Sequence, residues 1–272
     1  MSRQSSVVST YDLRPTTYDS GWLIHRFDSV ASTMDVASQL ARFGARERTA
    51  VVSAEQTAGR GRGGRSWQAA AGSAVFATLI LRPSVAAHRL STLPLIAGVA
   101  VAEALERIAG CPVWLKWPND VWLQVDGGAA KVAGILVTSS LRSESVDHVL
   151  VGVGINVLGG AQELPPGATS VEAATGVTVT PDEVFRCMLE RFANAYTAFV
   201  AADGRPSLTG WLARAALLGE LVIIEDAARS LTGTFVGVDE DGGLLIEESS
   251  YQIRKVVAGD LVRGPRAASQ PE

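Results

Sequence analysis

The sequence contains few of the residues that build metal centres or covalent cross-links. Its 272 residues include two cysteines, Cys111 and Cys187, and three histidines, His25, His88 and His148. The cysteines lack the Cys-x-x-Cys spacing of a zinc site, and the histidines are too scattered along the chain to predict a ligand cluster. We therefore expect neither a structural zinc site nor a disulfide framework.

Long apolar runs are also missing. The most apolar stretch, residues 93–104, is shorter than the roughly 20 residues that a membrane-spanning helix needs. Residues 1–20 are rich in Ser, Thr and Arg and lack the apolar core of a signal peptide, so we expect a flexible leader there. With 47% hydrophobic residues, the chain can still bury a sizeable core. These features predict a cytoplasmic protein without a membrane-spanning segment.

One part of the sequence lacks acidic residues altogether. The formal net charge is −4, yet no Asp or Glu occurs between residues 56 and 102. Five arginines fall inside that window: Arg60, Arg62, Arg65, Arg82 and Arg89. A cationic island on an acidic protein favours a small anionic ligand over general nucleic-acid binding, which usually accompanies a basic domain. A solvated arginine loop is the alternative interpretation.

The densest part of this window is residues 59–66, Gly-Arg-Gly-Arg-Gly-Gly-Arg-Ser, here called the Gly/Arg loop. Glycine lets a backbone approach an anion closely, and arginine binds carboxylate and phosphate through paired donors. The loop matches G-x-G-x-x-G and, with Arg65 in place of lysine, the P-loop pattern. Both motifs require a following helix, and the dinucleotide motif also requires a later acidic residue. The sequence indicates neither feature, so we exclude both nucleotide folds.

Three further segments place unusual groups in or beside strand-like runs. Lys116-Trp-Pro-Asn-Asp120 has turn residues between two such runs, and Lys131 begins an apolar one. Gly152-Val-Gly-Ile-Asn156 puts two glycines and an amide inside another, which indicates close approach of a second group. A hairpin turn and a surface lysine with an apolar stem would explain the first two segments equally well.

Hydrophobic periodicity predicts an α+β domain followed by a small β-barrel. Helices are expected at 32–44, 90–109, 181–201 and 207–218. Strands are expected at 49–53, 73–82, 113–117, 121–125, 131–139 and 148–157, joined largely by hairpins. Residues 159–180 read as a long loop, and loops of that length are often functional. Five short strands are expected in the barrel, at 221–225, 231–238, 243–247, 251–257 and 260–263.

Taken together, the motifs and their order resemble the biotin protein ligase family. The resemblance covers about Ser29 to Val157 in five blocks: Ser32-Thr33, Glu55 to Trp67, Lys116 to Asp120, Lys131 to Leu136 and Gly152 to Val157. It implies a class II aminoacyl-tRNA-synthetase-like catalytic domain, with a mixed, mainly antiparallel sheet and flanking helices, followed by an SH3-like barrel. The expected domains are the leader at 1–20, the catalytic domain at 21–218, the barrel at 219–266 and a flexible tail at 267–272.

The resemblance also implies an activity. Such an enzyme uses ATP and Mg²⁺ to convert biotin to biotinyl-5′-adenylate and transfers the biotinyl group to a lysine of the biotin carboxyl carrier domain of an acyl-CoA carboxylase. Lys131 would contact the biotin carboxylate and the phosphate, Arg60 would close the loop, and Asp120 would lie near the attacking lysine or Mg²⁺. No protein ligand set for the metal is assigned.

Individual binding residues follow from the same resemblance. Those implied for biotin are Ser32, Thr33, Gln56, Gly59, Arg60, Gly61, Arg62, Lys131 and Gly134. Those implied for ATP or the adenylate are Arg62, Arg65, Trp67, Lys116, Asn119, Asp120, Lys131 and Asn156.

Other activities fit parts of this pattern. Lipoate or octanoate ligases share the catalytic fold, and a non-catalytic biotin sensor or a nucleic-acid-binding module would also use an arginine island. The Gly/Arg loop and the segment 116–120 favour biotin. About 20 residues precede Gly21, too few for the DNA-binding module of repressor members. We therefore expect the monofunctional form, without a nucleic-acid partner, as a monomer or weak homodimer.

Overall fold

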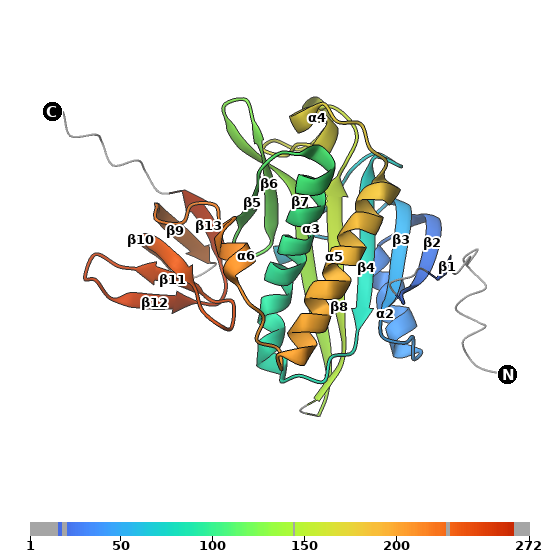
Figure 1. Cartoon of the computed structure of the whole chain (residues 1–272), viewed down its shortest axis with the longest axis horizontal. Helices are drawn as coiled ribbons and strands as arrows, with labels where there is room; N and C mark the ends of the chain where they lie inside the picture. The colour runs from blue at the N-terminus through green and yellow to red at the C-terminus, as the bar shows by residue number, and fades with distance from the viewer. Residues whose placement is uncertain (1–15, 18–20, 144, 227–228, 264–272) are drawn as a thin grey trace.

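The computed structural model describes residues 16–17, 21–143, 145–226 and 229–263. Within these residues the chain forms a larger unit built on one sheet and a smaller C-terminal unit built on another (Figure 1). The expected tail at 267–272 and most of the expected leader lie outside the described residues. Thr16–Thr17 of that leader forms strand β1, which pairs with the first long strand of the larger sheet.

The larger sheet contains eight of the described strands, in the order β1-β2-β3-β4-β8-β7-β6-β5. Their bounds after β1 are β2 Leu23–Val30, β3 Thr49–Gln56, β4 Ala74–Leu81, β5 Val113–Lys116, β6 Asp120–Val125, β7 Gly128–Arg142 and β8 Ser145–Asn156. Strands β2 and β3 pair in parallel, and the other described neighbours pair antiparallel. The prediction of a mixed, mainly antiparallel sheet is confirmed.

Helices cover both faces of this sheet. Helices α3 (Leu93–Ala109) and α5 (Pro181–Ala201) lie side by side across the face seen in Figure 1. Their apolar side chains form one core with Leu79 and Leu81 of β4. Ile80 of β4 points the other way and packs with Val36 and Ala37 of α2 (Thr33–Arg42). No helix in the described ranges is both long and apolar enough to span a membrane.

Local sequence sets the helix boundaries. The Ser32 hydroxyl accepts a hydrogen bond from the backbone N–H of Met34 and begins α2. Gly110, in the left-handed conformation, ends α3. Thr180 and Glu183 form a capping box at the start of α5. The helix predicted at 181–201 is confirmed with the same bounds, and the one predicted at 90–109 begins with the 3-10 turn η2 (Ala87–Thr92) before α3.

One expectation for the connections is wrong, and another is incomplete. The helix expected at 207–218 is the single turn α6 (Thr209–Leu212). It stops because the following backbone pairs with β5: the N–H of Leu115 donates to the Arg214 carbonyl, and the N–H of Ala216 donates to the Leu115 carbonyl. The loop expected at 159–180 contains the 3-10 turn η3 (Ala161–Glu163) and the short helix α4 (Val171–Thr175).

Strand β2 was not among the expected elements, because its charged and apolar residues do not alternate.

The C-terminal unit consists of five described strands in the antiparallel order β12-β11-β10-β9-β13. Their bounds are β9 Leu221–Asp226, β10 Arg229–Val238, β11 Leu244–Glu247, β12 Ile253–Val256 and β13 Asp260–Arg263. All five lie where the sequence predicted strands. Their buried side chains, among them Phe235 and Leu261, join the same core cluster as the larger unit, and the Trp211 and Phe235 rings meet edge to face at 6.4 Å.

Arg82, at the end of β4, fastens α2 to the sheet. Its guanidinium donates to the carbonyl of Ala41 in the last turn of α2, to that of Ala45 just beyond the helix and to that of Asp147 in β8, at 2.8 to 3.0 Å. The Ala41 carbonyl also accepts a hydrogen bond from the backbone N–H of Gly44. Arg82 therefore links the C-terminal end of α2 to β8 through three charged hydrogen bonds.

Replacing Arg82 with alanine should therefore lower the free energy of unfolding by about 2 kcal/mol, the usual worth of a charged hydrogen-bond donor. Urea denaturation measures this change. Arg142→Ala is the matched control, because Arg142 is exposed and lies 3.8 Å from the same Asp147; its effect should stay within about 0.5 kcal/mol. Equal losses for the two variants would contradict the fastening role of Arg82.

Candidate active site

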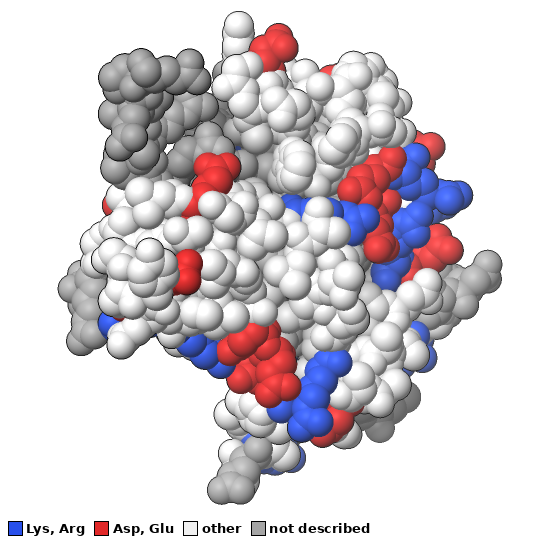
Figure 2. Space-filling model, turned by 60° about the vertical axis from the view of Figure 1, so that its left-hand side comes forward, with Lys and Arg blue, Asp and Glu red and all other residues white. Residues whose placement is uncertain are grey.

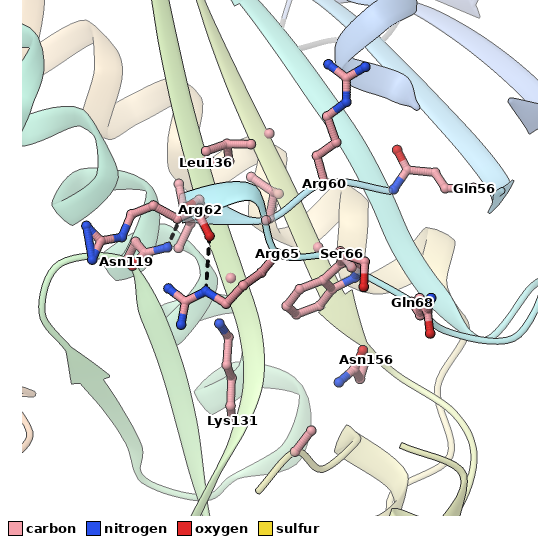
Figure 3. Close-up of a pocket in the computed structure, with 18 of the residues that line it drawn as sticks. Gln56, Arg60, Arg62, Arg65, Ser66, Gln68, Asn119, Lys131, Leu136 and Asn156 are labelled. Carbon is pink, nitrogen blue, oxygen red and sulfur yellow. Dashed lines mark hydrogen bonds between the residues drawn. The ribbon is translucent and has the colours of Figure 1, made fainter. Parts of the chain in front are cut away.

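A cavity of about 220 Å³ opens between the start of α2, the Gly/Arg loop, strands β7 and β8, and the segment 165–168 (Figure 3). It lies over the interior strands β7 and β8 of the sheet, and all five motif blocks of the sequence contribute residues to its lining. Most of the residues implied for biotin or ATP line it: Ser32, Thr33, Gln56, Arg60, Gly61, Arg62, Arg65, Trp67, Asn119, Lys131, Gly134 and Asn156.

One end of the cavity is polar but uncharged. The side-chain oxygen of Gln56 accepts hydrogen bonds from the Thr33 backbone N–H at 2.7 Å and from the Thr33 hydroxyl at 3.0 Å. The Thr33 hydroxyl in turn accepts one from Thr78 at 2.9 Å. Ser32 and Thr33 are almost completely buried. This chain of hydrogen bonds fixes the positions of small hydroxyl and amide groups without introducing a charge.

The Gly/Arg loop closes on itself through its backbone. Arg60 and Ser66 form an antiparallel bridge, the N–H of Gly61 donates to the Arg65 carbonyl, and the N–H of Trp67 donates to the Gly59 carbonyl. A Cβ atom at Gly59 would lie 2.3 Å from the Trp67 carbonyl oxygen, so a side chain does not fit there. A strand, β4, follows the loop instead of a helix, which agrees with the exclusion of the two nucleotide-binding motifs.

The indole of Trp67 lies against two glycines of the sheet. Gly134 of β7 and Gly154 of β8 are partners across the ladder. A Cβ atom would lie 3.0 Å from the indole at Gly134 and 2.5 Å from it at Gly154. At Gly152, a Cβ atom would lie 2.9 Å from the sulfur of Met34. The close approach that the sequence predicted at the two β8 glycines is confirmed, and it forms the apolar middle of the cavity.

The other end of the cavity is cationic. Lys131 reaches from β7 toward the Gly/Arg loop, with its Nζ 2.6 Å from the Asp120 carboxylate and 5.4 Å from the centre of the Trp67 ring (Figure 3). Lys116 lies outside the lining, with its Nζ 4.8 Å from the centre of the Trp122 ring. Burial lowers the pKa of Lys116, although the nearby carboxylate of Asp120 opposes the shift.

The loop arginines obtain acidic partners from distant parts of the chain. Arg60 pairs with Asp35 of α2 at 2.8 Å. Arg62 and Arg65 both pair with Asp260 of β13, in the C-terminal unit. On the molecular face in Figure 2, acidic and basic side chains likewise gather in mixed clusters. The acid-free window of the sequence is therefore neutralised in the folded chain.

Three of the expected residues lie outside the cavity lining. Gly59 is covered by the Trp67 carbonyl, Lys116 is turned toward Trp122, and Asp120 meets the cavity only through Lys131. The structure adds lining residues that the sequence reasoning did not name as binding residues: Met34, Ser66, Gln68, Ala77, Ile135, Leu136, Gly152, Val153, Gly154, Pro165, Pro166, Gly167 and Ala168. The last four of these residues lie in the long loop at 159–180, whose length had already indicated a functional role.

The segment 165–169 is fixed to Lys131 by the backbone. The Lys131 N–H donates to the Gly167 carbonyl, and the Thr169 N–H donates to the Lys131 carbonyl, both at 2.9 Å. Asn156 donates its amide N–H to the Thr169 carbonyl at 3.0 Å. The Asn156 Oδ1 atom is buried and has no hydrogen-bond partner within the described residues. It offers a ligand an acceptor at the cavity wall.

No group of three or more His, Cys, Asp or Glu side chains in the described part of the chain could hold a metal ion. The carboxylate paired with Lys131 is that of Asp120. The site therefore suits a ligand with a neutral polar head, an apolar middle and an anionic end, and a metal ion there would need ligands from that anion.

Comparison with known proteins agrees with this geometry. Residues 27–156 match the Biotin/lipoate A/B protein ligase family, and residues 217–264 match the Biotin protein ligase C terminal domain. The chain is 34% identical over 245 residues to the Bifunctional ligase/repressor BirA of Bacillus subtilis, covering 87% of this chain and 73% of that protein. It is 40% identical over 204 residues to the Biotin--[acetyl-CoA-carboxylase] ligase of Paracoccus denitrificans, covering 72% and 82%.

The structure of the biotin protein ligase from Aquifex aeolicus in complex with biotin and ATP also matches. Its TM-score is 0.73 at 31% identity, and the match covers 89% of this chain and 99% of that one. The expected fold, an α+β domain followed by an SH3-like C-terminal domain, is confirmed. With its two matched segments, its relatives and its cavity in agreement, the chain belongs to the Biotin/lipoate A/B protein ligase family.

Proposed function

We propose that the chain is a biotin protein ligase. It activates biotin with ATP to biotinyl-5′-adenylate and transfers the biotinyl group to a lysine of a carboxyl carrier domain of an acyl-CoA carboxylase. The observation that carries this proposal is the graded cavity, which joins the uncharged hydrogen-bonding end at Thr33 and Gln56 to the cationic end at Lys131. Related proteins named as biotin ligases support it.

Each part of biotin would meet a matching part of the cavity. The ureido ring is neutral and carries donors and acceptors, so it would lie at Ser32, Thr33 and Gln56. The apolar ring and chain would lie along Trp67 and the neighbouring glycines. The carboxylate would then reach Lys131, whose position is set by the strand backbone and by Asp120.

In the first step, a carboxylate oxygen of biotin attacks the α-phosphorus of ATP. The new O–P bond forms as the bond to pyrophosphate breaks, and pyrophosphate leaves with the electron pair. Both reactants are anions, so the main requirement is positive charge placed before they meet. Lys131 would supply it at the reacting oxygens, and Arg62 and Arg65 would supply it along the phosphates.

In the second step, the uncharged ε-amine of the acceptor lysine attacks the carbonyl carbon of the adenylate. AMP leaves, and the amine loses a proton. Asp120 is the carboxylate beside Lys131 and would take that proton, while Arg60 would close the Gly/Arg loop over the adenylate and keep water away. Asn119, Asn156 and Lys116 would contact or face the nucleotide.

Mg²⁺ would enter with ATP. When bound, the ion neutralises phosphate charge during the transfer. Asp120 is the protein carboxylate best placed to orient it, and the phosphate oxygens would supply most of the remaining ligands, since no group of three or more His, Cys, Asp or Glu among the described residues could hold a metal ion.

The direct test is to incubate the protein with ATP, Mg²⁺, labelled biotin and a purified carboxyl carrier domain. Covalent label on the acceptor and release of pyrophosphate are expected. The same assay is repeated with labelled lipoate in place of biotin. Label on the acceptor from lipoate but not from biotin would overturn the assignment. Binding of biotin without any transfer would instead identify a sensor.

Lys131→Met should abolish adenylate formation, with a loss of at least about a hundredfold in the rate of pyrophosphate release, because the charge at the reacting oxygens is gone. The chain has three lysines, Lys116, Lys131 and Lys255. Lys255→Met is the control, since Lys255 pairs with Asp239 and Asp241 of the C-terminal unit, and its rate should stay near wild type. A folded Lys131→Met protein of normal rate would remove Lys131 from the mechanism.

Gly154→Ala should displace the Trp67 indole, because the added Cβ would lie 2.5 Å from the ring. Overpacking of this kind typically costs about 1–3 kcal/mol. We expect the KM for biotin or ATP to rise about tenfold, measured by pyrophosphate release. Gly160→Ala is the matched control, because a Cβ there meets no atom within 4 Å. An unchanged KM in Gly154→Ala would exclude Trp67 as a ligand wall.

A further inference from the structure

The C-terminal unit reaches the cavity through one carboxylate. Asp260, the first residue of β13, pairs with Arg62 and lies 3.3 Å from Arg65. The carbonyl of the adjacent Gly259 accepts a further hydrogen bond from Arg62. Both arginines line the cavity. Two binding cations of the larger unit therefore share one anion that belongs to the smaller unit.

Asp260 lies within a wider cationic field. Burial raises the pKa of its carboxyl, but the hydrogen bond and charge of Arg62, together with Arg65, outweigh burial and hold that pKa below its ordinary value. The negative charge of Asp260 also acts on Lys116, where it favours the protonated amine and so raises the pKa. The carboxylate thus supplies the countercharge that a phosphate group would supply if it entered this end of the cavity.

An arginine that binds a carboxylate through a given pair of N–H donors cannot give those donors to a phosphate at the same time. We propose that Asp260 is a positioning residue which holds Arg62 and Arg65 in the ligand-free protein and releases them to the phosphates of ATP. ATP binding is then coupled to the C-terminal unit through this exchange. The inference rests on the proposed function, because it identifies the incoming anion as ATP.

The contacts around Asp260 determine the direction of the expected effect. The Gly/Arg loop has its own backbone bridge between Arg60 and Ser66, so it does not depend on Asp260 to stay folded. The C-terminal unit is docked separately: the Trp117 indole N–H donates to the Gly242 carbonyl at 2.9 Å, and the buried Arg89 pairs with Asp241 at 2.8 Å. Removing the charge of Asp260 should therefore free the two arginines without separating the units.

The test is direct binding of ATP, measured by calorimetry on the full chain, together with the KM for ATP in pyrophosphate release. Asp260→Asn keeps the size of the side chain and removes its charge. Its Kd and KM for ATP should fall about two- to tenfold, the worth of two partly exposed ion pairs, while the KM for biotin stays constant. Asp260→Glu restores the charge and should return the Kd for ATP to within about twofold of wild type.

Asp241→Asn is the matched control. It removes an ion pair between the units that involves Arg89, which does not line the cavity, so the Kd for ATP should not change. Asp260→Ser serves as a second uncharged variant if Asp260→Asn does not fold. An unchanged or higher Kd for ATP in the folded, uncharged variants would overturn the proposal. So would an equal fall in Asp241→Asn, since the effect would then reflect loosening of the units.

The experiments distinguish a failure of the proposed ligase function from a failure of the proposed exchange at Asp260. If the wild-type protein binds ATP but forms no biotinyl-adenylate, the proposed ligase function fails, while the calorimetric comparison still tests the exchange at Asp260. If the wild type forms the adenylate and the uncharged variants bind ATP as it does, only the exchange fails.

Discussion

Compensation of positive charge is the constraint on which this site depends. Arg60, Arg62, Arg65 and Lys131 surround one small cavity, and cations this close destabilise a fold unless anions lie nearby. The folded chain supplies three such anions, Asp35, Asp120 and Asp260. Each comes from a different element, namely α2, β6 and β13. The charges of the site are therefore fully compensated only when the helix, the sheet and the C-terminal unit are all in place.

The same arrangement explains why the cavity can remain folded without a ligand. Each of these cations has an anionic partner within the chain, so each stays paired when no ligand is bound. The ion pairs are partly exposed, which keeps each of them weak. Weak internal pairs can be replaced by a substrate anion without a large barrier, whereas fully buried pairs would hold the arginines in place.

Features set by neighbouring residues could be predicted from the sequence. The helix bounds at 109 and 181 were predicted correctly, because the groups that set them, Gly110 and the Thr180–Glu183 capping box, lie next to them in the chain. Gly152 and Gly154 indicated the close approach that Met34 and Trp67 make. Contacts between distant residues could not be predicted. The partner of Arg60 is 25 positions away and that of Arg62 is 198 positions away, so the acid-free window appeared uncompensated. The helix expected at 207–218 was lost to strand pairing for the same reason.

The packing of Trp67 on the glycine pair also restricts how the sequence can change. Gly134 and Gly154 are ladder partners under one indole. A larger side chain at either glycine position therefore requires a smaller one at position 67. Conversely, a smaller residue at position 67 leaves a cavity that a methyl group at position 134 or 154 would fill. Positions 67, 134 and 154 are far apart along the chain, but their residues should change together. Across related ligases, substitutions at any one of them should therefore be accompanied by changes at the others.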